Sequence, residues 1–259
     1  MIKSSFTDKK LAISLGGGAA RGAFHLGFLH FCEQNGIEFQ AYSGSSIGSI
    51  ISASHASGVL AKELLELFNS KDTKNLIKFN YFKNGLFKIQ DDSKVLDKFF
   101  PIKRLEDINK PVYVNAYDLK KKELHYFKEG DTKTLCKASS ALIPLFKPIA
   151  YKNMYLIDGG LFDNLPIKPI LNKGYHIISL DLFPSKAKSS IEQKTNLIKP
   201  LKKKIFTQLY ENKKFTKEYT DEYISTIKLL EFSLFTFDEI QDCFCLGFKE
   251  AENFFLDII

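Results

Sequence analysis

The chain has no long apolar run. No stretch of its 259 residues approaches the roughly 18 consecutive apolar residues that cross a bilayer. Residues 1–10 are polar and charged, and they lack the pattern of a secretory signal peptide. We therefore expect a cytoplasmic protein, either free or peripheral on the inner face of the membrane.

Cysteine is also scarce. The four cysteines are Cys32, Cys136, Cys243 and Cys245. One residue separates the last two, and no histidine or second cysteine pair lies near them, so the spacing does not fit a zinc site. We interpret them as reduced, partly buried thiols. The sequence predicts neither a metal nor a cofactor.

Most of the chain carries no net positive charge. The formal net charge is +7, but residues 186–217 alone hold ten lysines against two glutamates. Leu201, Ile205 and Leu209 recur at helical spacing among those lysines. Residues 200–213 are therefore either a basic amphipathic helix that meets an anionic membrane or a surface helix packed by its leucine face. We expect no nucleic-acid partner, because no recognition module is present. The oligomeric state stays open.

Short apolar runs alternate with helical patterns, which favours an α/β fold. Residues 11–15 and 39–43 predict buried strands, and residues 20–34 and 47–57 predict helices after them. We also expect strands at 112–117, 123–127, 154–157, 175–183 and 223–229, helices at 63–68, 94–100, 132–142, 166–171 and 238–255, and an irregular cap or loop at 75–87. The prediction is a single domain over 1–259, with core motifs at 11–182, a basic segment at 186–217 and a terminal strand and helix within 223–256.

The string Gly44-Ser45-Ser46-Ile47-Gly48 matches G-x-S-x-G, the turn that exposes a serine nucleophile between a strand and a helix. Small neighbours at Gly44 and Gly48 let the serine side chain project past the backbone. A plain helix N-cap is the alternative interpretation of Ser46. Its position between a strand pattern and a helix pattern favours the nucleophile.

A glycine run, Gly16-Gly17-Gly18-Ala19-Ala20-Arg21-Gly22, lies upstream. The dinucleotide fingerprint fails because Arg21 stands where its third glycine would fall, and the lysine of a P-loop is absent. Backbone N–H groups of such a turn can instead form an oxyanion hole. A purely structural turn is the alternative.

Asp158-Gly159-Gly160 follows an apolar run, 112 residues after Ser46. Asp-Gly is a common turn pair, so a structural role is possible on this string alone. A carboxylate acting as a general base would need burial or contact with Ser46, because an ordinary aspartate titrates near ~3.9.

In order and local sequence these three motifs resemble those of the patatin-like phospholipases. The runs Arg21 to Leu29 (RGAFHLGFL) and Asp158 to Pro166 (DGGLFDNLP) extend the similarity. It covers roughly 11–182, and 232–251 more loosely. The resemblance implies a three-layer α/β/α sandwich with a mostly parallel central sheet.

The resemblance further implies a Ser-Asp dyad that hydrolyses acyl esters of lipids, of the phospholipase A or lysophospholipase type. Ser46 would be the nucleophile and Asp158 the base. One departure is Ala19, where many members have a third glycine. The implied oxyanion hole is Gly17, Gly18 and Ala19, and the supporting motif residues are Gly16, Arg21, Gly22, Gly44, Gly48, Gly159 and Gly160.

Two alternatives stay open at this point. Chain order also allows a Ser-Asp-His esterase made of Ser46, Asp158 and His176, although His176 begins an apolar strand, where a packed histidine is expected. The other alternative is a catalytically idle membrane- or protein-binding member of the fold. For Arg21 we favour a structural role in holding the glycine turn.

Overall fold

The computed structural model describes residues 2–71, 73, 77–78, 88–89, 94–143, 145–184, 213–234, 236 and 238–256. Most of the loop expected at 75–87 and residues 200–212 of the predicted basic helix lie outside these ranges. Lys213, the last residue of that predicted helix, is described, and its side chain is buried.

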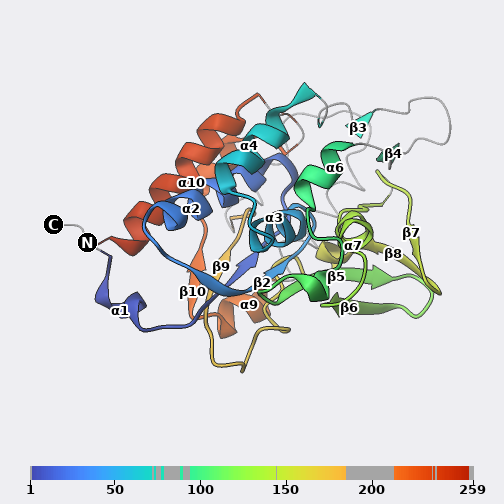
Figure 1. The fold of residues 1–259 in the computed structure, drawn as a ribbon, viewed down its shortest axis with the longest axis horizontal. Helices are drawn as coiled ribbons and strands as arrows, with labels where there is room; N and C mark the ends of the chain where they lie inside the picture. Colours follow the sequence, from blue (N-terminus) through green and yellow to red (C-terminus); the bar gives the residue numbers. More distant parts are fainter. Residues whose placement is uncertain are drawn as a thin grey trace.

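An open, mixed eight-stranded sheet runs through the middle of the molecule (Figure 1). Its order is β10-β9-β1-β2-β5-β8-β7, with β6 paired to β5. The strands from β10 to β5 are parallel neighbours, whereas β6, β8 and β7 join by antiparallel pairing. The bounds are β1 Leu11–Leu15, β2 Phe39–Gly44, β5 Val112–Asp118, β6 Glu123–Phe127, β7 Ile149–Tyr151, β8 Met154–Asp158, β9 His176–Leu180 and β10 Glu222–Ile224; β3 (Ile77–Lys78) and β4 (Lys88–Ile89) pair separately.

Helices lie on both sides of this sheet, which confirms the expected α/β/α fold. In Figure 1, α2, α3, α4 and α10 lie above strands β1, β2 and β9, and α9 lies below them. The helices are α1 Ser4–Thr7, α2 Gly22–Gln34, α3 Ile47–Ala56, α4 Ala61–Asn69, α6 Lys94–Phe99, α7 Thr132–Ser139, α9 Lys214–Tyr219 and α10 Ile240–Phe255, with short 3-10 turns η1 Ala19–Arg21, η2 Leu105–Asp107, η3 Gly159–Leu161 and η5 Ile227–Glu231.

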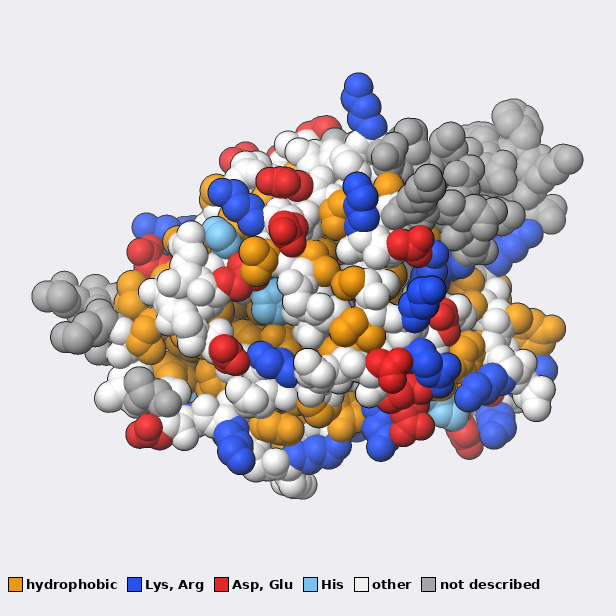
Figure 2. All heavy atoms as spheres, in the orientation of Figure 1, with side chains coloured by type: hydrophobic (Ala, Val, Ile, Leu, Met, Phe, Trp, Pro, Cys, Tyr) orange, Lys and Arg blue, Asp and Glu red, His pale blue; other side chains and the backbone are white. Residues whose placement is uncertain are grey.

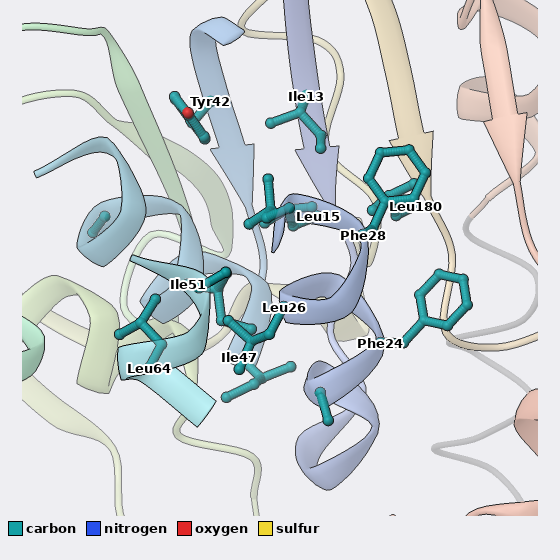
Figure 3. Packing of buried hydrophobic residues seen from close by; sticks show 14 of the residues in the cluster. Ile13, Leu15, Phe24, Leu26, Phe28, Tyr42, Ile47, Ile51, Leu64 and Leu180 are labelled. Atoms are coloured by element: carbon teal, nitrogen blue, oxygen red, sulfur yellow. The ribbon is translucent and has the colours of Figure 1, made fainter. Parts of the chain in front are cut away.

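The two faces of the sheet bury different amounts of apolar surface. Because strand side chains alternate, Ile13 and Leu15 of β1 point into the larger cluster, and Ala12 points into the smaller one. Figure 3 shows Ile13 and Leu15 on the side of the sheet that α2 covers, with Phe28 of that helix near them. Burial of a phenylalanine or leucine side chain stabilises the fold by about 1.5–3 kcal/mol, so the upper layer dominates the core.

Helices α2 and α10 pack so closely that their backbones touch. A Cβ added to Gly27 would lie 1.9 Å from the Phe244 carbonyl oxygen, and one added to Gly247 would lie 2.0 Å from that of Phe24. Only glycine fits at such a crossing. This contact ties the C-terminal helix to the helix that follows the glycine run.

Several predicted elements are wrong in whole or in part; the helix expected at 132–142 ends at Ser139, and the strand expected at 175–183 is His176–Leu180. Residues 166–171 form turns instead of a helix. Pro169 has no N–H for the Leu165 carbonyl, which accepts the Thr216 hydroxyl at 2.6 Å, and the Pro166 carbonyl accepts the Ser14 hydroxyl at 2.9 Å. The Ile170 N–H bonds the Ile167 carbonyl instead of the Pro166 carbonyl. The strand expected at 223–229 ends at Ile224, opposite Leu180, where its partner β9 also ends. A 3-10 turn, η5, follows.

Candidate active site

The strand register brings Ser46 and Asp158 to one place. Gly44, the last residue of β2, pairs with Val114 of β5. Asp158, the last residue of β8, pairs with Ala116, two residues further along β5. The two motifs, far apart in sequence, therefore meet at the carboxyl edge of the sheet.

Ser46 sits on a strained turn. Its φ of 51° and ψ of −124° are rare for a residue with a side chain. The turn is tight: a Cβ on Gly44 would lie 2.4 Å from the Gly48 carbonyl oxygen, and one on Gly48 would lie 2.0 Å from that of Leu15. Helix α3 begins at the next residue, so the serine lies near the positive end of a helix dipole.

Asp158 is a buried carboxyl group, 5% exposed. Its carboxylate accepts a hydrogen bond from the Gly160 N–H at 2.7 Å, and the Ser46 hydroxyl lies near enough to favour the ionised form. Burial raises the pKa of Asp158 to about 7, and these two groups only partly oppose that rise. At neutral pH this carboxyl group can therefore both take up and release a proton.

The glycines after Asp158 let neighbouring groups approach closely. A Cβ on Gly159 would lie 2.6 Å from Asn115 Cγ, and one on Gly160 would lie 2.7 Å from Asn164 Oδ1. Gly22 is equally confined, because a Cβ there would lie 2.5 Å from Cγ1 of Ile47. Side chains at these positions would push the turns apart.

The amides of the glycine run divide into two groups. The Gly16 N–H donates to the Leu180 carbonyl at 3.1 Å, and the Gly17 N–H donates to the Asn164 carbonyl at 3.2 Å. This contradicts the expectation that Gly17 is available as an oxyanion donor. Within the described part of the chain, the N–H groups of Gly18 and Ala19 have no acceptor. Ala19 has a φ of 48°, a conformation that favours glycine.

Two side chains hold the glycine run in place. The buried Arg21 guanidinium donates to the carbonyls of Phe232 at 2.9 Å and Leu182 at 3.2 Å, which supports the structural role expected for it. His25 Nε2 lies 2.8 Å from the Gly16 carbonyl. Burial lowers the pKa of His25 to about 4, so the imidazole is neutral and Nε2–H donates this bond.

Ser139 is a site residue that sequence reasoning missed. Its Oγ accepts the Ser46 N–H at 2.9 Å and donates to Asn115 Oδ1 at 3.4 Å. Asn115 in turn donates to the Asp163 carbonyl at 2.6 Å. This buried chain of hydrogen bonds fixes the backbone of the serine turn. No motif spacing indicates it, because the contact joins residues 93 apart in sequence.

His176 does not reach the site. It pairs with Leu11, the first residue of β1, whereas the site follows the last residue, Leu15. Four residues of strand, roughly 13 Å, separate the two edges. His176 lies instead near Asp221 and Glu222, at 3.6 and 3.4 Å. The Ser-Asp-His alternative is wrong for this reason.

A small apolar hollow adjoins the site. It is lined by Ala19, Ala20, Gly22, Ala23, Ile47, Phe68 and Ile240. Among the described residues, no group of three or more His, Cys, Asp or Glu side chains could hold a metal ion. In the same ranges, no helix is both long and apolar enough to cross a bilayer.

Comparison with known proteins agrees with this arrangement. A family model described as "Patatin-like phospholipase" matches residues 13–171. Lysophospholipase NTE1 of Candida albicans is 26% identical over 184 residues, which is 68% of this chain and 13% of that protein. The patatin-like phospholipase domain-containing protein ZK370.4 of Caenorhabditis elegans is 27% identical over 200 residues, covering 74% of this chain and 14% of that protein.

The fold has a solved counterpart in VipD from Legionella pneumophila. The TM-score is 0.53 at 16% identity, covering 66% of this chain and 49% of that chain. The fold and the site define an α/β protein with a G-x-S-x-G turn near a buried aspartate. The family model covers more than half of the chain, so the chain belongs to the patatin-like phospholipase family. It spans about an eighth of the length of the curated relatives it matches.

Proposed function

We propose that this chain hydrolyses acyl esters of lipids through a Ser46–Asp158 dyad. The observation that carries the proposal is a buried carboxyl group, with its pKa raised to about 7, that lies near enough to the Ser46 hydroxyl for the hydroxyl to favour its ionised form. A base works best when its pKa lies near the working pH. The strained turn at Ser46 supports the same role.

The reaction runs in two steps. Asp158 takes the Ser46 proton as Oγ bonds the acyl carbon, and the proton then passes to the departing alcohol when the ester C–O bond breaks. In the second step Asp158 takes a proton from water, whose oxygen bonds the acyl carbon. The Ser46–acyl bond breaks, the proton returns to Ser46, and a fatty acid is released.

The oxyanion of both steps would accept hydrogen bonds from Gly18 and Ala19. Their N–H groups have no acceptor within the described ranges. Gly17 is left out of the proposed hole because its N–H is already bonded to Asn164. The names of the lysophospholipase relatives support a lipid ester as the substrate.

The test compares fatty-acid release from lysophosphatidylcholine by the wild type, Ser46→Ala and Asp158→Asn. Each variant should lose about 10⁴-fold or more in kcat, and the double variant should lose no more than either, because the two residues act as a unit. Ser54→Ala is the matched control: Ser54 lies in the same helix, its hydroxyl bonds the Ile50 carbonyl at 2.8 Å, and activity should persist.

The pH profile gives a second readout. Only the ionised carboxylate can accept the proton, so kcat/KM should rise with pH and level off above about 7, the pKa of Asp158. Full activity in Ser46→Ala would rule out the dyad. A wild type that hydrolyses no ester would favour the idle, binding-only member of the fold.

A further inference from the structure

Two hairpin turns project from the sheet edge that carries Ser46. β5 runs parallel to β2 and continues beyond it, because β2 ends opposite Val114 and β5 ends at Asp118. The β5–β6 turn, residues 119–122, therefore lies beyond the site. The β7–β8 turn, residues 152–153, lies beside it, because the Leu119 N–H donates to the Tyr155 carbonyl at 2.9 Å. These hairpins form the right-hand end of the molecule in Figure 1.

This end exposes apolar and aromatic side chains. Tyr155 is 48% exposed, Phe162 40% and Leu119 39%. Phe162 stacks on Tyr117, with ring centroids 3.6 Å apart and 8° between the ring planes. Tyr117 and Tyr155 face the same side of the sheet, since Tyr117 pairs with Ile157, two residues from Tyr155. We call Tyr117, Leu119, Tyr155 and Phe162 the apolar tip.

Lysines surround the apolar tip. Lys120, Lys121 and Lys122 fill the β5–β6 turn, and Lys152 opens the β7–β8 turn; all four are exposed. Lys120 Nζ lies 4.6 Å from the centre of the Tyr155 ring. Among the described residues that adjoin these turns in sequence, Glu123 is exposed and Asp118 is buried, so four lysines stand against two carboxylates and the net charge is positive. Blue and orange side chains meet at this end of the molecule in Figure 2.

We propose that the apolar tip and its lysines dock on the surface of an anionic lipid bilayer. Amphipathic rings such as tyrosine favour the membrane interface, and each lysine near an anionic leaflet adds roughly fivefold in affinity. A surface with positively charged lysines around exposed aromatic rings complements anionic headgroups. The docking site consists of other residues than 200–213, where the sequence alone suggested membrane contact.

Docking here would present the candidate active site to the lipid. Asp158 pairs with Ala116, three residues before Leu119, so the tip reaches about 10 Å beyond the carboxyl group. Interfacial segments insert about 5–10 Å into the headgroup region. Ser46 and Asp158 would then lie at the level of the acyl ester bonds. Binding itself does not depend on the proposed hydrolysis, and it is measured without it.

The first experiment is sedimentation with vesicles of phosphatidylcholine, with and without phosphatidylserine. The wild type should bind the anionic vesicles, and Leu119→Ser/Lys121→Glu should weaken binding roughly tenfold or more. The matched control is Ile227→Ser/Lys228→Glu, because Ile227 is 50% exposed and follows β10 at the opposite edge of the sheet. The control should bind as the wild type does. Equal binding by the Leu119 variant, or no binding by the wild type, overturns the proposal.

The second experiment uses the absence of tryptophan from this chain. Tyr155→Trp introduces a single fluorophore at the tip, and its emission should shift to the blue when anionic vesicles are added. Ile227→Trp should show no shift. An unshifted spectrum from the Tyr155 variant would mean that the tip stays in water, which contradicts docking.

Light scattering measures the oligomeric state and so tests the alternative that the apolar tip binds a second copy of this chain. If the wild type dimerises and Leu119→Ser/Lys121→Glu does not, the tip is a self-association surface and the membrane proposal fails. Vesicle binding that survives in Ser46→Ala, with hydrolysis lost, would support both proposals. Hydrolysis lost in Ser46→Ala but vesicle binding unchanged in the Leu119 variant would leave the dyad standing and remove only the docking site.

Discussion

Two buried aspartates stand where strands end at the carboxyl edge of this sheet, and their surroundings differ. Asp181 follows β9, is fully buried, and accepts hydrogen bonds from the Lys213 ammonium, the Tyr223 hydroxyl and the Phe183 N–H. Asp158 ends β8 and accepts a hydrogen bond from the Gly160 N–H, and the other group that favours its ionised form is the neutral Ser46 hydroxyl. One carboxylate has a cation against it, and the other has none among its described contacts.

The comparison separates a structural carboxylate from a reactive one. Burial lowers the pKa of Lys213, and the Asp181 carboxylate opposes that change because it stabilises the charged ammonium. Asp158 has no such partner, so burial raises its pKa to about 7. A charge that is uncompensated in the folded protein lowers stability, but it leaves a carboxylate ready to accept a proton.

Breaking the Asp181 cluster should have the largest effect on stability. Asp181→Asn keeps the shape of the side chain but removes the charge that offsets the buried Lys213 ammonium. We expect the free energy of unfolding to fall by about 3–5 kcal/mol. Urea denaturation followed by circular dichroism would measure it. A loss no larger than that of an exposed substitution such as Asp97→Asn would contradict the assigned structural role.

Replacement of Asp158 by asparagine should instead raise the free energy of unfolding, by an amount that depends on pH. With a pKa near 3.8 unfolded and about 7 folded, Asp158 holds an extra proton only in the folded state between these values. The contribution of Asp158 to the free energy of unfolding of the wild type therefore falls as pH rises from about 4 to 7, and it falls no further above 7.

Asp158→Asn has no charge to penalise. It should be more stable than the wild type at pH 8 by up to about 4 kcal/mol, with a smaller gap at pH 5. Because the variant is compared with the wild type at each pH, the effect of His25 cancels. Urea denaturation at both pH values would measure the gap. An Asp158→Asn variant less stable than the wild type at pH 8 would mean that the carboxylate is compensated after all.

The smallest effect concerns a single hydroxyl group of the Asp181 cluster. Tyr223→Phe removes one donor to Asp181 and leaves Lys213 in place. We expect a loss of about 1–2 kcal/mol, which is typical of a hydrogen bond to a charged group. Thermal unfolding monitored by circular dichroism would show it. An unchanged melting temperature would assign the compensation of Asp181 to Lys213 alone.

Much of this arrangement could be predicted from sequence because it depends on local pattern. Leu11–Leu15 is an unbroken apolar run ended by glycines, and it forms β1 with those bounds. The strands expected at 112–117 and 123–127 likewise form β5 and β6, with one residue added to the first. Ser46 and Asp158 were found because each lies in a short motif between a strand and a helical turn.

Other features depend on contacts between distant parts of the chain. Residues 166–171 look helical, but they form turns, and the carbonyls of Leu165 and Pro166 accept hydroxyl groups from the distant Thr216 and Ser14. Ser139 supports the Ser46 turn across 93 residues, and no spacing could indicate it. Gly17 was predicted to be an oxyanion donor, but its N–H donates to the Asn164 carbonyl.

The serine turn and the aspartate turn show which features the sequence determines and which require the tertiary structure. Residue order alone determined that this chain carries a serine turn and an aspartate turn, because glycine spacing and apolar runs are local properties. Only the tertiary structure decided that they meet, since the β2–β5 and β8–β5 registers place them two residues apart on one strand. It also decided that the buried Asp181 contacts the Lys213 ammonium, whereas the buried Asp158 contacts no described cation. Burial and charge pairing arise from the packing of distant segments.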